Sequence, residues 1–265
     1  MPQAFNTIAQ QYDVSFTNTL IGTAQRKIVW NYLEKSLPKK KNLKILELNC
    51  GTGEDAIWFA KQGHYVLATD VSEKMLAITQ KKIEAAGMET QVQILKLDIN
   101  QIENFDAEEK FDFVFSNFGG LNCVKPEILN EVQFQIKKLL HQDGRLIMVI
   151  MSSFCIWETI YFLTKLKFRD SFRRLSKSGT VANLNGAELK TYYYSPSKLK
   201  RIFKKLFKNN AIMPVGFFIP PSYLEKFFKK HRELLTWLNK LEKLICNRKL
   251  LSRFSDHFLI DFELK

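Results

Sequence analysis

Residues 45–56 read ILELNCGTGEDA, and this stretch decides the fold. Leu43 to Leu48 is a short apolar run bounded by turn residues, which is the pattern of a buried parallel strand. Gly51 and Gly53 follow in a turn whose backbone can adopt φ values closed to other residues and can approach a ligand closely. A helix is predicted from about Glu54, and its first N–H groups have no partner within the helix. The stretch therefore predicts a site for a polar or anionic ligand.

Outward from this stretch, the first half of the chain alternates strands with helices. The spacing of apolar residues predicts a helix over 22–37, before the first strand. Ser72 is a suitable N-cap, and Gly63 and Gly87 are suitable C-terminal residues, for the helices between the strands. Strands separated by helices form a parallel sheet with right-handed crossovers. The predicted elements are helices over 54–61, 73–86 and 126–140 and strands over 65–69, 92–97, 111–115 and 145–151.

The second half of the chain is less regular and carries the charge. Residues 151–265 hold 23 Lys and Arg against nine Asp and Glu, whereas residues 1–150 are nearly neutral. A basic half suggests an anionic partner, but the polar faces of solvated amphipathic helices are the preferred explanation for many of these lysines. The predicted elements are an amphipathic helix over 152–170, a hairpin over 178–194 turning at Asn185-Gly186, a helix from Ser195-Pro196 to about Lys208, a strand over 211–219 broken by Pro220-Pro221, two short helices over 221–250, and a strand over 257–264.

Composition excludes several classes of protein. The 265 residues are 46% apolar and 25% charged, as in globular domains. Four widely spaced cysteines exclude a disulfide framework or a cysteine-rich zinc site, and no metal site is predicted. The N-terminus lacks a signal-peptide pattern. The most apolar stretch, Leu146 to Leu163, contains Glu158 and is interpreted as a strand that runs into a helix. We therefore expect a cytoplasmic protein without stable membrane insertion.

Three acidic residues follow the pattern of the strands. Glu47 lies in the first strand, Asp70 ends the second and Asp98 follows the third. The carboxyl ends of parallel strands meet at one edge of the sheet, where open α/β sheets bind ligands. A carboxylate at the position of Asp70 can accept both hydroxyls of a ribose. One such acid is usually a helix N-cap, but three together predict a nucleoside-binding site.

These motifs resemble those of the class I S-adenosylmethionine-dependent methyltransferases, over residues 1–151. ILELNCGTGEDA resembles the family's glycine-rich first motif, with Asn49 in place of its first glycine. VLATDVSEKML, the LDI that contains Asp98, and FDFVFSNFGGLNCV are similar to the next three motifs, and AFNTIAQQYD to its leading segment. The resemblance implies S-adenosylmethionine as cofactor and S-adenosylhomocysteine as product. It implies that the cofactor is bound by Tyr12, Glu47, Asn49, Cys50, Gly51, Gly53, Asp70, Val71, Met75, Asp98, Ile99, Asn117 and Phe118.

The same resemblance implies an α/β fold with a Rossmann-like, mostly parallel seven-stranded sheet, helices on both faces, and a lid of helices and a hairpin. Residues 1–151 would form the cofactor-binding core and 152–195 a lid insertion. Residues 196–265 would complete the core and carry a second helical insertion at about 220–255. An NAD-type Rossmann domain is the rival interpretation, because Gly51, Gly53 and Ala56 also fit GxGxxA; Glu47, Asp98 and the long helical segment before the first strand argue against it.

The methyl acceptor is harder to read from the sequence. Methyl transfer needs a general base only where the acceptor keeps its proton, and His257 is the sole, weak catalytic candidate. Ser116 to Gly119 lacks the Asn/Asp-Pro-Pro-aromatic motif of enzymes that methylate base amines. Lid residues that would line an apolar acceptor pocket, or pair with an acidic acceptor, are Phe154, Trp157, Tyr161, Arg169 and Tyr193.

We therefore expect a small-molecule methyl acceptor, and a monomer or homodimer that does not use nucleic acid as its partner. Two alternatives stay open. One is a methyltransferase that acts on RNA or protein through the basic half. The other is a cofactor-binding protein without turnover.

Overall fold

The computed structural model describes residues 2–184 and 187–265, and a seven-stranded sheet forms their centre. The strand order is β3-β2-β1-β4-β5-β9-β8. The first five strands run parallel, and β9 runs antiparallel to both of its neighbours. The strands are β1 (Lys44–Leu48), β2 (Tyr65–Asp70), β3 (Val92–Lys96), β4 (Phe111–Ser116), β5 (Leu140–Met151), β8 (Phe207–Val215) and β9 (His257–Leu264).

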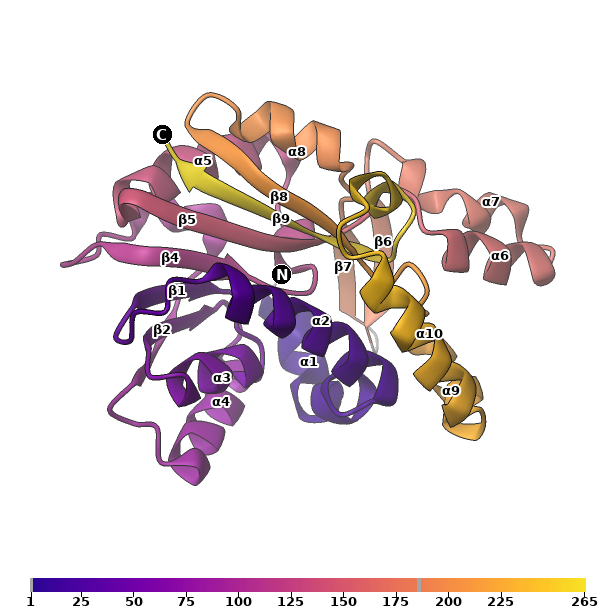
Figure 1. Ribbon diagram of the computed structural model, residues 1–265, viewed down its shortest axis with the longest axis horizontal. Coiled ribbons are helices and arrows are strands. Elements are labelled where there is room, and N and C mark those ends of the chain that lie inside the picture. The colour runs from indigo at the N-terminus through magenta and orange to yellow at the C-terminus, as the bar shows by residue number, and fades with distance from the viewer. Residues whose placement is uncertain (1, 185–186) are drawn as a thin grey trace.

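Helices cover both faces of this sheet, as Figure 1 shows. Successive strand residues face opposite sides, so Phe113 and Phe115 of β4 pack in one core and Val114 in the other. This is why the strands read as continuous apolar runs. One core is completed by α2 (Leu20–Ser36), α3 (Glu54–Lys61) and α4 (Glu73–Ala86), and the other by α5 (Pro126–Leu139) and α8 (Pro196–Phe203).

The remaining elements lie beyond the carboxyl edge of the parallel strands. Helix α1 (Pro2–Tyr12) continues into the π-helix η1 (Asp13–Thr17), and the hairpin of β6 (Thr180–Leu184) and β7 (Ala187–Thr191) lies beside α1. Helices α6 (Ile156–Thr164), α7 (Phe168–Ser171), α9 (Glu225–Lys230) and α10 (Arg232–Leu244) project at one end of the molecule, with 3-10 turns η4 (Arg173–Leu175), η5 (Ser222–Leu224) and η6 (Lys249–Arg253) (Figure 1). No helix in the described ranges has the length and apolarity needed to cross a bilayer.

The predicted fold class is confirmed, and most boundaries in the first half agree to within a residue or two. Ser72 caps α4 through its side chain, and Gly87 ends that helix with φ 64°. Strand β5 is an exception, because it begins at Leu140, five residues before the predicted start. The division into a core and two insertions stays a prediction.

Three predictions in the second half are wrong. The helix expected over 152–170 is broken, because Leu166 adopts φ 56° between α6 and α7. Helix α8 ends at Phe203 rather than Lys208, because Phe207 and Lys208 pair with β9. Strand β8 accordingly covers 207–215 rather than 211–219. The predicted turn at Asn185-Gly186 lies outside the described residues.

Candidate cofactor site and lid

The turn after β1 has the backbone geometry that its glycines predict. Gly51 and Gly53 adopt φ 57° and 80°, and Gly53 is the N-cap of α3. Asn49, which stands where the family pattern has a glycine, adopts φ 59°. Asparagine is among the few residues that tolerate this left-handed conformation, so the substitution preserves the path of the turn.

The two glycines of the turn have different surroundings. A Cβ on Gly53 would lie 2.5 Å from Cγ2 of Thr79 in α4, so this glycine is needed for packing. A Cβ on Gly51 would meet only Cε1 of Tyr12, at 3.8 Å. The turn therefore packs tightly against α4 at Gly53 and leaves room beside Gly51.

Asp70 connects the end of β2 to this turn. One carboxylate oxygen accepts a hydrogen bond from Gly51 N at 3.0 Å, and the other accepts one from Ser72 N at 2.8 Å. Burial raises the pKa of Asp70 to about 6, although these backbone donors oppose the rise. The carboxylate is thus held rigidly against the glycine turn.

Glu47 and Asn49 each carry a buried oxygen without a hydrogen-bond partner among the described residues. Burial raises the pKa of Glu47 well above its usual range, and the neighbouring Asp55 adds to the rise. Buried polar atoms of folded proteins normally have hydrogen-bond partners. These two oxygens beside the glycine turn are therefore suited to accept hydrogen bonds from a ligand.

Other predicted cofactor residues lie around the same edge. Asp98 accepts a hydrogen bond from Asn100 N at 2.9 Å and so caps the 3-10 helix η2 (Ile99–Asn104), which is also the ordinary role of an acid at this place. Met75 and Ile99 are buried, and Val71 is half-buried. Cys50 is buried as well, and burial raises the pKa of its thiol well above the usual range.

Sequence reasoning missed a buried ion pair beside the turn. Arg26 of α2 pairs with Asp55 of α3, and Asp55 also accepts hydrogen bonds from Asn117 Nδ2 at 2.9 Å and Trp30 Nε1 at 2.6 Å. The Arg26 guanidinium lies 5.0 Å from the Phe118 ring centre. Polar Gln25 and Arg26 within the apolar stripe of the predicted helix were the available signal.

Helix α1 lies over this arrangement. Asn6 Oδ1 accepts hydrogen bonds from Ser72 Oγ at 2.7 Å and Lys74 N at 3.3 Å, and Asp13 accepts one from Thr52 Oγ1 at 2.6 Å. Burial raises the pKa of Tyr12 to about 12. The remaining crevice is narrow, about 20 Å³, and is lined by Tyr12, Arg26, Asn49, Cys50, Gly51, Thr52, Glu54, Asp55, Asn117 and Phe118.

Comparison with known proteins agrees with this geometry. Residues 45–144 match a family model described as a methyltransferase domain. The chain thus contains a methyltransferase domain over these residues. A solved S-adenosylmethionine-dependent methyltransferase from Clostridium acetobutylicum shares the fold, with a TM-score of 0.60, 14% identity and coverage of 98% of both chains.

Curated relatives of this methyltransferase fold match shorter stretches at higher identity. A Bacillus subtilis protein named "Putative methyltransferase YqeM" is 35% identical over 48% of this chain and 49% of its own length. The tRNA 5-carboxymethoxyuridine methyltransferase of Escherichia coli K12 is 28% identical over 34% of this chain and 36% of its own. A demethylmenaquinone methyltransferase of Bacteroides fragilis is 24% identical over 81% of this chain and 83% of its own. The chain thus spans about half the length of the relatives that it matches at 34–35% identity.

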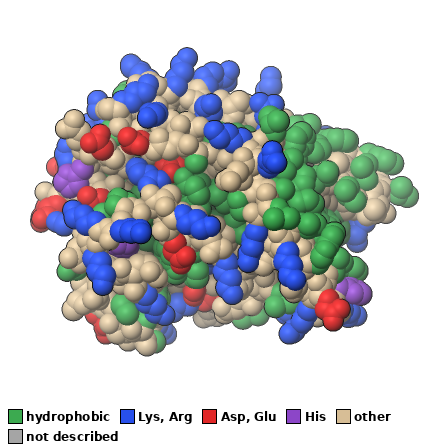
Figure 2. Space-filling view, viewed as in Figure 1, with side chains coloured by type: hydrophobic (Ala, Val, Ile, Leu, Met, Phe, Trp, Pro, Cys, Tyr) green, Lys and Arg blue, Asp and Glu red, His purple; other side chains and the backbone are tan. Residues whose placement is uncertain are grey.

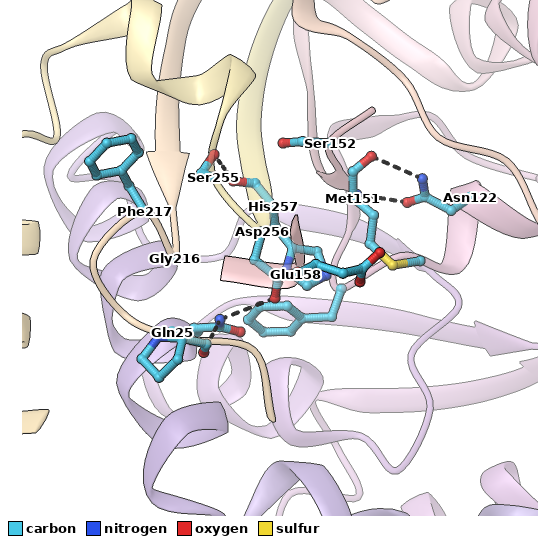
Figure 3. Close-up of polar contacts among 12 residues, drawn as sticks. Gln25, Asn122, Met151, Ser152, Glu158, Gly216, Phe217, Ser255, Asp256 and His257 are labelled. Carbon is cyan, nitrogen blue, oxygen red and sulfur yellow. Dashed lines mark hydrogen bonds and ion pairs between the residues drawn. The ribbon is translucent and has the colours of Figure 1, made fainter. Parts of the chain in front are cut away.

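His257, the predicted catalytic candidate, is the first residue of β9 and is buried. Its Nδ1 is 3.2 Å from Asp256 Oδ2, and its ring meets that of Phe118 edge-on, with centres 5.5 Å apart. Figure 3 shows His257 and Asp256 together with Gln25 and Glu158. Burial alone would raise the pKa of Asp256, but His257 and Arg174 hold that pKa well below its usual range. The structure thus joins His257, a carboxylate and a wall residue of the crevice.

Arg173 and Arg174 form ion pairs within the protein. Arg174 is buried and donates to Glu158 at 2.9 Å and to Asp256 at 2.7 Å, and Arg173 donates to Glu158 at 2.9 Å. These partners satisfy the charges within the protein, so Arg173 and Arg174 are not free to bind an acceptor. Arg169, in contrast, is exposed on α7.

The aromatic side chains predicted to bind the acceptor make several separate contacts, and their role stays a prediction. Phe154 packs on Phe254, Trp157 donates a hydrogen bond to Phe217 O at 2.9 Å, and Tyr161 packs on Tyr223. These contacts join α6 and the residue segment before it to the segment after β8, to η5 and to the end of η6. Tyr193 instead lines a separate cleft of about 490 Å³, whose wall also contains Ser153, Lys198 and Arg201.

Proposed function

We propose that this protein transfers the methyl group of S-adenosylmethionine to a small-molecule acceptor. The observation that carries the proposal is the bonding of Asp70 to Gly51 N and Ser72 N at the carboxyl edge of the sheet. That edge is the ligand-binding position of open α/β sheets. The strand order of the sheet and the match to the methyltransferase-domain model support the same assignment.

The residues at this edge suit the cofactor chemically. Asp70 would accept the ribose hydroxyls, and the unpaired oxygens of Glu47 and Asn49 would accept other donors of the cofactor. Met75, Asp98 and Ile99 would hold the adenine, while Tyr12, Asn117 and Phe118 would enclose the methionine end. Cys50, Gly51, Gly53 and Val71 complete the proposed set. The cofactor supplies a methyl group on a sulfonium, activated for in-line displacement.

The protein's own task is to align the acceptor and exclude water. Helices α1 and η1 would supply the exclusion, because the hydrogen bonds of Asn6 in α1 and Asp13 in η1 hold this segment over the turn. His257 lies close to Asp256, with 3.2 Å between Nδ1 and Oδ2, and Nδ1 makes no hydrogen bond to the described residues. We assign His257 as the base for acceptors that keep their proton at neutral pH.

The share of this chain that aligns with each relative supports a small-molecule acceptor. The match to the demethylmenaquinone methyltransferase extends over most of this chain, including the second half, whereas the match to the tRNA methyltransferase covers about a third of it. The aromatic side chains of the lid, Phe154, Trp157 and Tyr161, would then shape the acceptor end together with Arg169 and Tyr193.

Calorimetric titration with S-adenosylmethionine tests the cofactor assignment. Asp70→Ala should weaken binding by about 1.5–3 kcal/mol, because a charged acceptor of hydrogen bonds is lost. Glu73→Ala is the matched control, since Glu73 is a nearby exposed carboxylate paired with Lys96. Wild-type affinity in a folded Asp70→Ala protein would refute the assignment. Turnover with a panel of small metabolites, compared with bulk RNA, tests the acceptor class.

A further inference from the structure

The lid end of the molecule exposes large apolar side chains. Leu166 and Leu244 are each 77% exposed and Trp237 is 56% exposed, and Ile160, Phe168 and Leu250 are exposed as well. Figure 2 shows hydrophobic side chains gathered at the end of the molecule where Figure 1 places α6 and α7. Exposed apolar patches of this extent generally mark a binding surface.

Helix α10 shows that the patch is more than incomplete packing. Leu235 and Leu238 form its buried face and attach the helix to the core. Leu234, Trp237 and Leu244 form a second apolar stripe that stays exposed. A helix needs only one apolar stripe to pack on its own protein, so the second one serves something else.

Contacts make the patch continuous between the two halves of the lid. The ring centres of Tyr161 in α6 and Tyr223 in η5 are 4.9 Å apart. The N–H of Ile156 donates to Phe254 O at 3.0 Å, which joins the start of α6 to the end of η6. The exposed stripes of α6 and α10 therefore belong to one surface, which we call the lid patch: the exposed apolar residues of 156–175 and 223–254.

In the two segments that carry the lid patch, acidic and basic side chains differ in their exposure to solvent. Its acids are mostly turned inward: Glu158 binds Arg173 and Arg174, Glu225 accepts from the N–H groups of Leu20 and Ile21, and Glu242 accepts from those of 216–219. Glu233 is the exposed acid of these two described segments. The basic residues face outward: Lys165, Lys167, Arg169, Lys226, Lys229, Lys230, Arg232, Lys240, Lys243, Arg248, Lys249 and Arg253 are all exposed.

We propose that the lid patch binds the surface of a membrane that contains anionic lipids. Apolar side chains bordered by Lys and Arg match the interfacial region of such a membrane, where acyl chains lie below negative headgroups. A second copy of this chain would bring two cationic rims together, which opposes self-association. Leu166, Leu244 and Leu250 are aliphatic side chains that suit acyl chains, and a nucleic acid would leave them without an apolar partner. The inference concerns peripheral binding and does not depend on the identity of the methyl acceptor.

Co-sedimentation with vesicles tests this proposal. The wild-type protein should bind phosphatidylglycerol vesicles, bind pure phosphatidylcholine vesicles roughly tenfold or more weakly, and release the former as salt rises. Trp237 is the most exposed of the four tryptophans, so vesicles should shift the fluorescence maximum to shorter wavelength. The triple variant Leu166→Ser/Phe168→Ser/Leu250→Ser should lose most of this binding.

Controls separate the proposal from its rivals. Tyr65→Ser removes an exposed apolar side chain at the other end of the sheet and should bind vesicles like the wild type. The triple variant should bind S-adenosylmethionine with wild-type affinity. This measurement distinguishes a failure of the membrane-binding proposal from a failure of the proposed function. The proposal is overturned if the protein does not bind phosphatidylglycerol vesicles, or if it binds phosphatidylglycerol and phosphatidylcholine vesicles with equal affinity. It is also overturned if light scattering shows a dimer that the triple variant dissociates.

Discussion

At the scale of single residues, the glycine turn contains Asn49 where the family pattern has a glycine, and a residue elsewhere in the chain leaves space for the asparagine side chain. Asn49 keeps the left-handed backbone of the turn, but its side chain needs space that a glycine would not. Gly120, at the start of the 3-10 helix η3 (Gly120–Cys123), provides that space. A Cβ on Gly120 would lie 2.4 Å from Cβ of Asn49. The two positions are therefore coupled.

This coupling predicts a double-mutant cycle. Gly120→Ala should lower the free energy of unfolding by about 1–3 kcal/mol, because the added methyl overlaps Asn49. In an Asn49→Gly background the same substitution should cost much less, since all three close atoms belong to the Asn49 side chain. Urea unfolding of the four proteins measures the coupling. An equal cost in both backgrounds would show that Asn49 is not the obstacle.

Asp70 predicts a pH dependence of stability. Its folded pKa of about 6 lies above its usual value of 3.8 because the carboxyl is buried. Protonation therefore favours the folded state, so the contribution of Asp70 to stability is fully present below pH 3.8 and is lost as the pH rises through about 6. Relative to Asp70→Ala, the wild type should lose up to about 3 kcal/mol across this window. Urea unfolding of both proteins from pH 4 to 7 tests this, and a constant difference would contradict it.

At the scale of elements, α1 borders the crevice, because Tyr12 at its end lines it. Asn6 and Asp13 attach the segment to α4 and to the glycine turn, and Lys82 of α4 lies 2.6 Å from both Asp13 and Glu54. The crevice of about 20 Å³ is smaller than a nucleoside, so we infer that α1 moves when a cofactor enters. Breaking the hydrogen bonds of Asn6 would then contribute to the free-energy barrier to cofactor entry.

Asn6→Ala should consequently speed cofactor association by about fivefold. The physical reason is the loss of roughly 1 kcal/mol of hydrogen bonding that favours the closed position of α1. Stopped-flow fluorescence with S-adenosylhomocysteine measures the rate. Thr7→Ala is the matched control on α1, because Thr7 Oγ1 bonds only within its own helix, to Gln3 O. Identical association rates in Asn6→Ala and Thr7→Ala would place the barrier to entry elsewhere.

At the scale of the whole molecule, the charge and the ligand edge lie in different parts of the chain. The nearly neutral first half builds the cofactor edge, and the second half carries the net charge of the protein, +13 in all. Lys204, Lys205 and Lys208 lie where α8 passes into β8, and all three are exposed. Nothing in this placement brings them to the glycine turn.

RNA binding distinguishes a solvated lysine face from a phosphate-tracking one. We expect weak, non-specific binding of RNA even at low salt, and unchanged turnover in the triple variant Lys204→Gln/Lys205→Gln/Lys208→Gln. A dedicated RNA site would instead bind tightly and lose affinity steeply with salt, in proportion to the phosphates contacted. Filter binding across a salt series measures this. Roughly micromolar affinity at physiological salt, lost together with activity in the triple variant, would reassign the acceptor to RNA.

The sequence by itself determined the α/β core. Strands such as β1 and β4 are buried on both faces, so their apolar runs are unambiguous, and Ser72 and Gly87 mark the ends of α4 through purely local geometry. The positions of Glu47, Asp70 and Asp98 followed from the same pattern, because the carboxyl ends of parallel strands share one edge. What they bind stays a prediction.

Only the tertiary structure decided the features that depend on distant partners. Phe203 and Phe207 fit a helix or a strand equally well, and pairing of Phe207 with Leu264 in β9 decides where α8 ends. Arg26 interrupts the apolar stripe of its helix, but the sequence does not show which acid it meets, and Arg174 reads as an ordinary charged surface residue. Their burial depends on Asp55 and on Asp256, which is 82 residues beyond Arg174 in the chain. Periodicity reports which face of an element is apolar, but a buried charge is stable only where folding brings its counter-charge, and no local pattern encodes that meeting.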